Sequence, residues 1–271
     1  MVGVLFCLAG CASPPPATDR IVSTNPCLDA ILVELVPAER IGAISHWSRD
    51  PRSTSMSLDV ARRLKTTSGT AEEVIALRPG LVLASSFTSP ATLGAYRRLG
   101  RLKFATFGTA ATIEENRAQI RAIARLVGAQ ARGEVLVARI DRAVAAAAPP
   151  EGNRPSALLW LGGSNLVNGE GTLIDEMVKR AGFRNASADY GVRYTGALPL
   201  EHVVARTPDV VMTPAAGMDA DEEGRRASLR MRALRGKAQI ADFPANLFYC
   251  GGPTIVPAMA RLAAIRRQVR S

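Results

Sequence analysis

Short apolar runs alternate with segments of helical spacing along most of this chain. Strands are predicted at residues 20–23, 40–45, 81–84 and 103–107, and helices at residues 27–35, 71–77 and 92–99. The run at 81–84 is apolar at every position, which is typical of a strand buried on both faces of a parallel sheet. Strands and helices that alternate in this way indicate an α/β fold, with a parallel sheet covered by helices.

A long segment without proline follows this first set of elements. Residues 112–148 have helical spacing with a break near Gly128, and Pro149-Pro150 ends the pattern. The second part, residues 130–148, would be about 28 Å long at about 1.5 Å per residue. We expect this helix to connect two separate parts of the fold.

The alternation of strands and helices then starts again. Strands are predicted at residues 157–161, 210–213 and 238–242, and helices at residues 173–181, 200–206 and 257–269. Residues 72–83 resemble residues 200–212, because each segment is a short helix, then Pro-Gly or Pro-Asp, then an apolar strand. Such an internal repeat predicts two Rossmann-like βα lobes joined by one long helix. The predicted domains are an N-terminal lobe at 20–111, a helical connection at 112–153 and a C-terminal lobe at 154–271.

The chain begins with an apolar segment at residues 2–9, too short to span a bilayer, which takes about 20 residues. Small residues and a proline-rich stretch follow, so we predict a secretory signal peptide at residues 1–10 and a tether at residues 11–19. Leu8-Ala9-Gly10-Cys11 resembles the lipobox of bacterial lipoproteins. That resemblance implies that Cys11 is lipidated and anchors the protein to a membrane of the cell envelope, in the periplasm. Because no Lys or Arg precedes the apolar segment, a buried N-terminal strand is the alternative.

Charge raises a second question, since 34 basic and 24 acidic residues give a formal net charge of +10. A charge of this size is often found in proteins that bind nucleic acid or anionic surfaces. Here the excess is shared about evenly by the two predicted lobes, with no run of five like charges. We therefore expect a generally basic surface and no nucleic-acid partner. A basic cleft between the lobes would favour an anionic ligand.

Catalytic motifs are missing from the sequence. There is no Gly-x-Ser-x-Gly elbow, no HExxH and no phosphate-binding loop, and two histidines offer little acid–base capacity. We therefore predict that the protein is not an enzyme, has no cofactor and has no site for a bare metal ion. The alternatives are a lipid-anchored enzyme with a non-obvious active site and a surface interaction lipoprotein.

Several motifs together resemble one known family. They are Ile21-Val22-Ser23 with the Asn25-Pro26 turn, the two repeated helix–proline–strand units, the stretch from Gly169-Glu170-Gly171-Thr172 to Asn185, and Cys250-Gly251-Gly252-Pro253. Over about residues 20–267 the chain resembles the periplasmic substrate-binding proteins of ABC importers for iron chelates, heme and cobalamin. The resemblance implies a class III periplasmic binding protein, with a ligand cleft between two lobes. It also implies a monomer that captures a ferric siderophore, cobalamin or heme and delivers it to an ABC permease and its ATPase.

Candidate ligand-binding residues follow from the cleft. Ligands of open parallel sheets bind beyond the carboxyl ends of the strands, which selects the loops at 24–27, 45–50, 85–89, 162–165 and 247–252. The residues predicted to bind the ligand are Asn25, Cys27, His46, Trp47, Arg49, Ser86, Tyr194, Phe248 and Cys250. Trp47 is either a ligand contact or a locally packed side chain. Tyr190 and Tyr194 face the cleft by analogy with the family, and Arg49 would pair with ligand carboxylates or phosphate.

Two further predictions concern cysteines and acidic residues. If Cys7 leaves with the signal peptide and Cys11 takes lipid, Cys27 and Cys250 remain as a pair. They would form a disulfide between the lobes, present thiols to a metal chelate, or be unrelated buried thiols. The family resemblance implies permease docking through one acid from each lobe, for which Asp221 and Glu222 are the second-lobe candidates. Residues 89–92 offer no matching acid in the first lobe, and a solvated acidic loop is the alternative.

Overall fold

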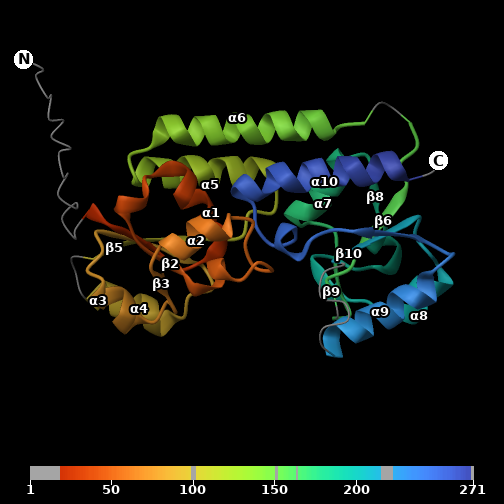
Figure 1. Cartoon of the computed structure of the whole chain (residues 1–271), viewed down its shortest axis with the longest axis horizontal. Helices are drawn as coiled ribbons and strands as arrows, with labels where there is room; N and C mark the ends of the chain where they lie inside the picture. The colour runs from red at the N-terminus through yellow and green to blue at the C-terminus, as the bar shows by residue number, and fades with distance from the viewer. Residues whose placement is uncertain (1–18, 99–101, 150–151, 163, 215–221, 270–271) are drawn as a thin grey trace, which may run out of the picture.

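The protein, in a computed structural model that describes residues 19–98, 102–149, 152–162, 164–214 and 222–269, consists of two α/β lobes. The lobes lie side by side, and a layer of long helices runs along one side of both (Figure 1). This arrangement confirms the fold class predicted from the sequence, including the long helix that connects the lobes.

Lobe one is built on a five-stranded parallel sheet. Its strands are β1 (Ile21–Ser23), β2 (Ile41–Ser45), β3 (Thr66–Thr67), β4 (Leu81–Ser85) and β5 (Lys103–Phe107), in the order β3-β2-β1-β4-β5. Its helices are α1 (Pro26–Leu35), α2 (Leu58–Arg63), α3 (Ala71–Ala76) and α4 (Pro90–Arg98). The predicted strands and helices of this half are all present, whereas α2 and β3 were not predicted. β1 is buried at all three positions, including Ser23, as expected for a strand at the centre of a sheet covered on both faces.

Lobe two has a four-stranded parallel sheet with a separate antiparallel pair beside it. The parallel strands are β6 (Ser156–Leu159), β8 (Arg184–Asn185), β10 (Val210–Thr213) and β11 (Gln239–Asp242), in the order β11-β10-β6-β8, and the pair is β7 (Leu166–Asn168) with β9 (Thr195–Ala197). The helices are α7 (Leu173–Arg180), α8 (Leu200–Ala205), α9 (Glu222–Leu234) and α10 (Ile255–Gln268). The repeated units occupy equivalent places, because β4 pairs with β1 and β10 pairs with β6. The paired strands β7 and β9, the short strand β8 and helix α9 were not predicted.

Two consecutive helices connect the lobes. α5 (Ile113–Leu126) and α6 (Gln130–Ala147) are separated by a turn in which Gly128 has φ +69°, a conformation that favours glycine. Thr112 caps α5, because its side chain accepts a hydrogen bond from the N–H of Glu115. The predicted break near Gly128 and the predicted long second helix are both confirmed.

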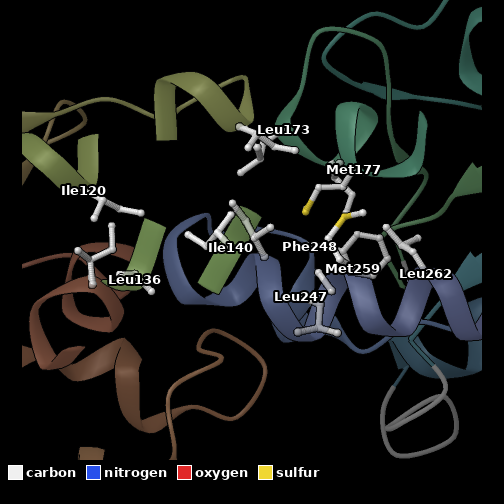
Figure 2. Packing of buried hydrophobic residues seen from close by; sticks show 14 of the residues in the cluster. Ile120, Leu136, Ile140, Leu173, Met177, Leu247, Phe248, Met259 and Leu262 are labelled. Carbon is white, nitrogen blue, oxygen red and sulfur yellow. The ribbon is translucent and has the colours of Figure 1, made fainter. Parts of the chain in front are cut away.

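One hydrophobic core joins the two lobes. The same cluster of buried side chains contains Ile21 of β1 and Met212 of β10. Figure 2 shows Ile140 of α6 near α10, and Met177 of α7 near Met259 of α10. Because α6, α7 and α10 pack together at this place, the core fixes the orientation of one lobe relative to the other.

The predicted signal peptide, the tether and the candidate lipidation site Cys11 lie outside the described residues. In the part of the chain that the structure describes, no helix combines the length and the apolar character needed to cross a membrane.

Candidate functional site

A cavity of about 250 Å³ lies between the two lobes, where the carboxyl ends of several strands meet. From lobe one it is lined by Asn25, Cys27, Leu28, Ser85, Phe87, Phe107, Gly108, Thr109 and Ala110. From α5 it is lined by Asn116 and Gln119, and from lobe two by Asn168, Thr172, Leu173, Ile174, Met177, Thr195, Phe248, Tyr249, Cys250 and Gly251. Larger hollows lie elsewhere on the surface of the described residues, whereas this cavity lies between strand ends of lobe one and loops of lobe two.

The start of α1 forms one wall of this cavity. Asn25 caps the helix, because its Oδ1 accepts hydrogen bonds from the N–H groups of Cys27 at 3.0 Å and Leu28 at 3.4 Å. Pro26 occupies the first turn, where its missing N–H has no cost. The Asn-Pro turn seen in the sequence therefore places Cys27 at the cavity.

A disulfide joins the lobes at this point. Cys27 is bonded to Cys250, with 5.1 Å between the two Cα atoms and 223 positions between them in sequence. Of the three alternatives for this pair, the structure has the disulfide. The pairing excludes free thiols that would bind a metal chelate in this state.

The loop after Cys250 reaches lobe one because two glycines allow a close approach. Gly252 has φ +63°, and a Cβ at this position would lie 2.6 Å from Cγ1 of Ile31. Its N–H donates to Oδ1 of Asn116 at 2.9 Å. The Cys-Gly-Gly-Pro motif of the sequence is thus the segment that closes the cavity from the side of lobe two.

Aromatic side chains supply much of the lining. Phe248 is buried and meets Phe243 edge to face, with ring centroids 4.9 Å apart. Phe87 and Tyr249 are exposed by 82% and 57%, so they form an accessible rim. Phe107 adds a half-buried ring at the end of β5. Such rings offer large flat contact areas to an apolar or planar ligand.

The expected basic cleft is not found. Every described residue that lines the cavity is uncharged, and the polar ones are amides and hydroxyls. The position of Arg49, which was predicted to bind the ligand, explains part of the difference. Arg49 donates hydrogen bonds to the carbonyl oxygens of Ala61 and Leu64, which hold its side chain within lobe one.

Four of the nine predicted ligand-binding residues line the cavity: Asn25, Cys27, Phe248 and Cys250. The other five do not: His46, Trp47, Arg49, Ser86 and Tyr194. Ligand contact by these five stays a prediction.

The order of the strands places the loop with His46 and Trp47 away from the cavity. β2 lies beyond β1, away from β4 and β5, whose ends line the cavity. On the 3₁₀ helix His46–Arg49 the rings of His46 and Trp47 lie 4.8 Å apart, and Trp47 is 53% exposed.

Tyr194 stands beside the cavity in an unusual conformation. Its φ of +57° is rare outside glycine, and its N–H donates to the carbonyl oxygen of Glu170 at 2.7 Å. Its ring is 62% exposed, and the next residue, Thr195, lines the cavity. Tyr190 is different, because its hydroxyl donates to the carbonyl oxygen of Arg206 within lobe two.

One buried carboxyl group stabilises the surroundings of the site. Asp29 of α1 accepts hydrogen bonds from the N–H of Ser45 at 2.8 Å and the hydroxyl of Ser48 at 2.7 Å. Complete burial raises the pKa of Asp29 to about 8, although both hydrogen bonds act to lower it. Asp29 thus connects α1 to the loop after β2.

The permease-docking candidates are only partly visible. Asp221 lies outside the described residues, and Glu222 begins α9, a helix that the sequence interpretation did not predict. The acidic stretch that contains Asp221 and Glu222 is therefore not a loop throughout, because it is helical from Glu222 onward. Among the described residues, no group of three or more His, Cys, Asp or Glu side chains is placed to hold a metal ion.

A family model described as periplasmic binding protein matches residues 21–228. The curated proteins include no match to the chain.

Solved structures are similar over nearly the whole chain. The periplasmic heme-binding protein RhuT from Roseiflexus sp. RS-1, in apo form, is 25% identical, with a TM-score of 0.71 and coverage of 91% of this chain and 98% of that one. The periplasmic heme-binding protein HutB of Vibrio cholerae is 19% identical, with a TM-score of 0.75 and coverage of 92% and 99%. The periplasmic vitamin B12 binding protein BtuF of Vibrio cholerae is 19% identical, with a TM-score of 0.69 and coverage of 93% and 97%.

Proposed function

The chain belongs to the periplasmic binding protein family, and we propose on this basis that it captures a metal chelate and delivers it to an ABC-type permease. The chelate is a ferric siderophore, a cobalamin or a heme. Two of the similar solved structures are named as a heme-binding protein and a vitamin B12 binding protein. These names support a metal chelate as the ligand. Members of this family are substrate-binding transport proteins, so we propose that this chain also binds without catalysis.

The observation that carries the proposal is the cavity between the lobes. It lies at the ends of β1, β4 and β5 and is lined by aromatic rings and uncharged polar groups. Flat rings such as Phe87, Phe107 and Tyr249 suit the face or edge of a macrocyclic chelate. Shared packing of α6, α7 and α10 keeps this surface formed without ligand, so less ordering is required when the chelate binds.

The proposed location is the periplasm, with the protein anchored by lipid on Cys11. The disulfide between Cys27 and Cys250 supports export, because disulfides form and persist in oxidising compartments. Import would be driven by hydrolysis on a separate ATPase, since this sequence has no phosphate-binding loop. The protein would act as a monomer.

A thermal-shift panel with cyanocobalamin, hemin and ferric siderophores tests the proposal. A ligand that binds only the folded protein stabilises it by about 2.7 kcal/mol at a concentration of 100 times Kd. We expect at least one chelate to raise the Tm and the others to do so less. If none of them changes the Tm at saturating concentration, chelate capture is excluded.

A Phe87→Ser variant tests whether the chelate binds at this cavity. Phe87 is 82% exposed, so its replacement should leave the Tm of the unliganded protein almost unchanged. Because the ring lies on the rim of the cavity, the variant should show a smaller ligand-induced shift. Equal shifts for both proteins would place the chelate at another surface.

A further inference from the structure

The topology of lobe one gathers basic residues at one edge of its sheet. All five strands are parallel, so the residues that begin the strands lie at the edge opposite the cavity, which is at the carboxyl ends. The turn between α5 and α6 lies at the same edge, because Nη1 of Arg40 donates to the carbonyl oxygen of Val127 at 2.8 Å. Eight residues make up this basic edge: Arg20, Arg40, Arg78, Arg97, Arg98, Lys103, Arg125 and Arg132.

Three kinds of segment bring these residues to the basic edge. Four of them stand at or shortly before the start of a strand: Arg20, Arg40, Arg78 and Lys103. Arg97 and Arg98 end α4, which leads back toward the start of β5, and the guanidinium of Arg97 lies 5.7 Å from the ring centre of Phe104 in β5. The remaining two flank the turn between α5 and α6. All eight side chains are exposed except those of Arg20 and Arg40, which are half-buried.

Acidic residues neutralise little of the charge of the basic edge. Asp19 and Glu39 stand beside it in the sequence, and no ion pair joins any of its eight side chains to another described residue. By contrast, Glu34 and Glu134 on adjoining turns of α1 and α6 are each paired with an arginine of the connecting helices. The even division of charge between the lobes in the sequence does not show this concentration. The cations of the basic edge are therefore available to an external anion.

The described part of the chain begins at the same edge. Asp19 is the first described residue, and Arg20 leads directly into β1. Figure 1 shows this start of the chain and the turn between α5 and α6 at the end of lobe one that faces away from lobe two. The segment from Cys11 to Asp19 can span at most about 28 Å, at about 3.5 Å per residue. If Cys11 carries lipid, as proposed above, the basic edge therefore lies within about this distance of a bilayer surface.

We propose that the basic edge binds the anionic headgroups of the membrane to which the protein is anchored. This inference rests on the lipid anchor of the proposed function and adds an electrostatic contact to it, since clustered Lys and Arg side chains are attracted to anionic lipids. Leu126, beside Arg125 at the end of α5, is 50% exposed and supplies an apolar side chain of the kind that enters the headgroup region. Nucleic acid would suit the same charge, but the path of the chain toward Cys11 favours the membrane.

Vesicle flotation of the full chain tests this inference, with Cys11→Ser so that no lipid anchor contributes. At about 0.1 M salt, we expect the protein to bind phosphatidylcholine vesicles that contain about one-third phosphatidylglycerol far more tightly than vesicles of phosphatidylcholine alone. Each Lys or Arg near an anionic bilayer contributes about fivefold to such partitioning. Raising the salt concentration to about 0.5 M should release the protein, because salt screens the attraction.

Two variants that each lose four exposed positive charges locate the contact. The edge variant carries Arg78→Gln, Arg98→Gln, Lys103→Gln and Arg125→Gln. The matched control carries the same changes in lobe two, at Arg154, Arg232, Lys237 and Arg267. The edge variant should bind the anionic vesicles at least about tenfold more weakly than the parent, and the control less than about threefold more weakly, because charges more than about 10 Å from the bilayer are screened. Equal losses in the two variants, or no preference of the parent for phosphatidylglycerol, overturn the inference.

Two further measurements separate this inference from other outcomes. Binding of a DNA duplex by the parent, without binding of anionic vesicles, overturns the membrane assignment in favour of nucleic acid. Because the basic edge lies opposite the cavity, the edge variant should keep the chelate-induced Tm shift of the parent. A parent that no chelate stabilises overturns chelate capture, whereas the membrane contact is decided by flotation alone.

Discussion

Removing the disulfide between Cys27 and Cys250 should destabilise the protein strongly. In the chain-entropy account, a covalent link stabilises a protein by restricting its unfolded chain, and the restriction grows with the length of the closed loop. The 223 positions between these cysteines make this loop long. The account gives about 18 cal/mol/K, or about 5 kcal/mol at 25 °C, as an upper limit.

The assay is urea unfolding of the double variant Cys27→Ser/Cys250→Ser against the oxidised parent. Cys7 and Cys11 should be replaced by Ser in both proteins, so that only the disulfide differs. We expect the free energy of unfolding to fall by several kcal/mol. A reducing agent should lower the stability of the parent to that of the double variant, with no effect on the double variant.

Thiol titration of the folded parent provides the direct check. We expect no titratable thiol before reduction and two afterwards. Two free thiols without reductant, or equal urea midpoints for the parent and the double variant, would refute the assignment of an interlobe disulfide.

Three further predictions concern packing, capping and pH. The Gly252→Ala variant should lose about 1–3 kcal/mol of stability in urea unfolding, because φ is +63° and the new Cβ would meet Ile31; an unchanged midpoint would contradict this geometry. Thr172→Ala should lose about 1 kcal/mol through the missing cap of α7, whereas Thr172→Ser should stay close to the parent. Because the pKa of Asp29 is raised to about 8, the folded state binds one more proton than the unfolded state between about pH 4 and pH 8. Stability should therefore fall as pH rises through this window, by at most about 1.4 kcal/mol per pH unit, and Asp29→Asn should remove that slope; equal slopes would show that Asp29 is not the titrating group.

The lobe architecture could be predicted because its signals are local. A buried parallel strand is apolar at each position, and the helix connecting the lobes ends at Pro149-Pro150. The Asn25 cap is encoded by neighbouring residues, so the sequence also located one wall of the cavity. Likewise, Cys250 stands shortly before the last predicted helix in the sequence, and this position identified the opposite wall of the cavity.

The rest of the site depends on pairing between distant strands. β4 pairs with β1, so the loop after β2, with His46 and Trp47, is left outside the cavity. From the order of the strands in the sequence alone, the ends of β1, β2 and β4 are equally good candidates for lining the cavity. Asn168 was also missed, because it lies in a three-residue strand whose partner, β9, is far along the chain.

The position of α10 near the end of the chain determines when folding can be completed during the export proposed above. A chain that crosses a membrane with its N-terminus first can form the sheet of lobe one early. Yet Cys27 meets Cys250 only after nearly all of the chain has emerged, and Met259 and Leu262 follow later still. Until then, lobe one carries an unpaired thiol and uncovered apolar surface. If the protein is exported as proposed, we expect the native fold to form only after release from the translocation channel.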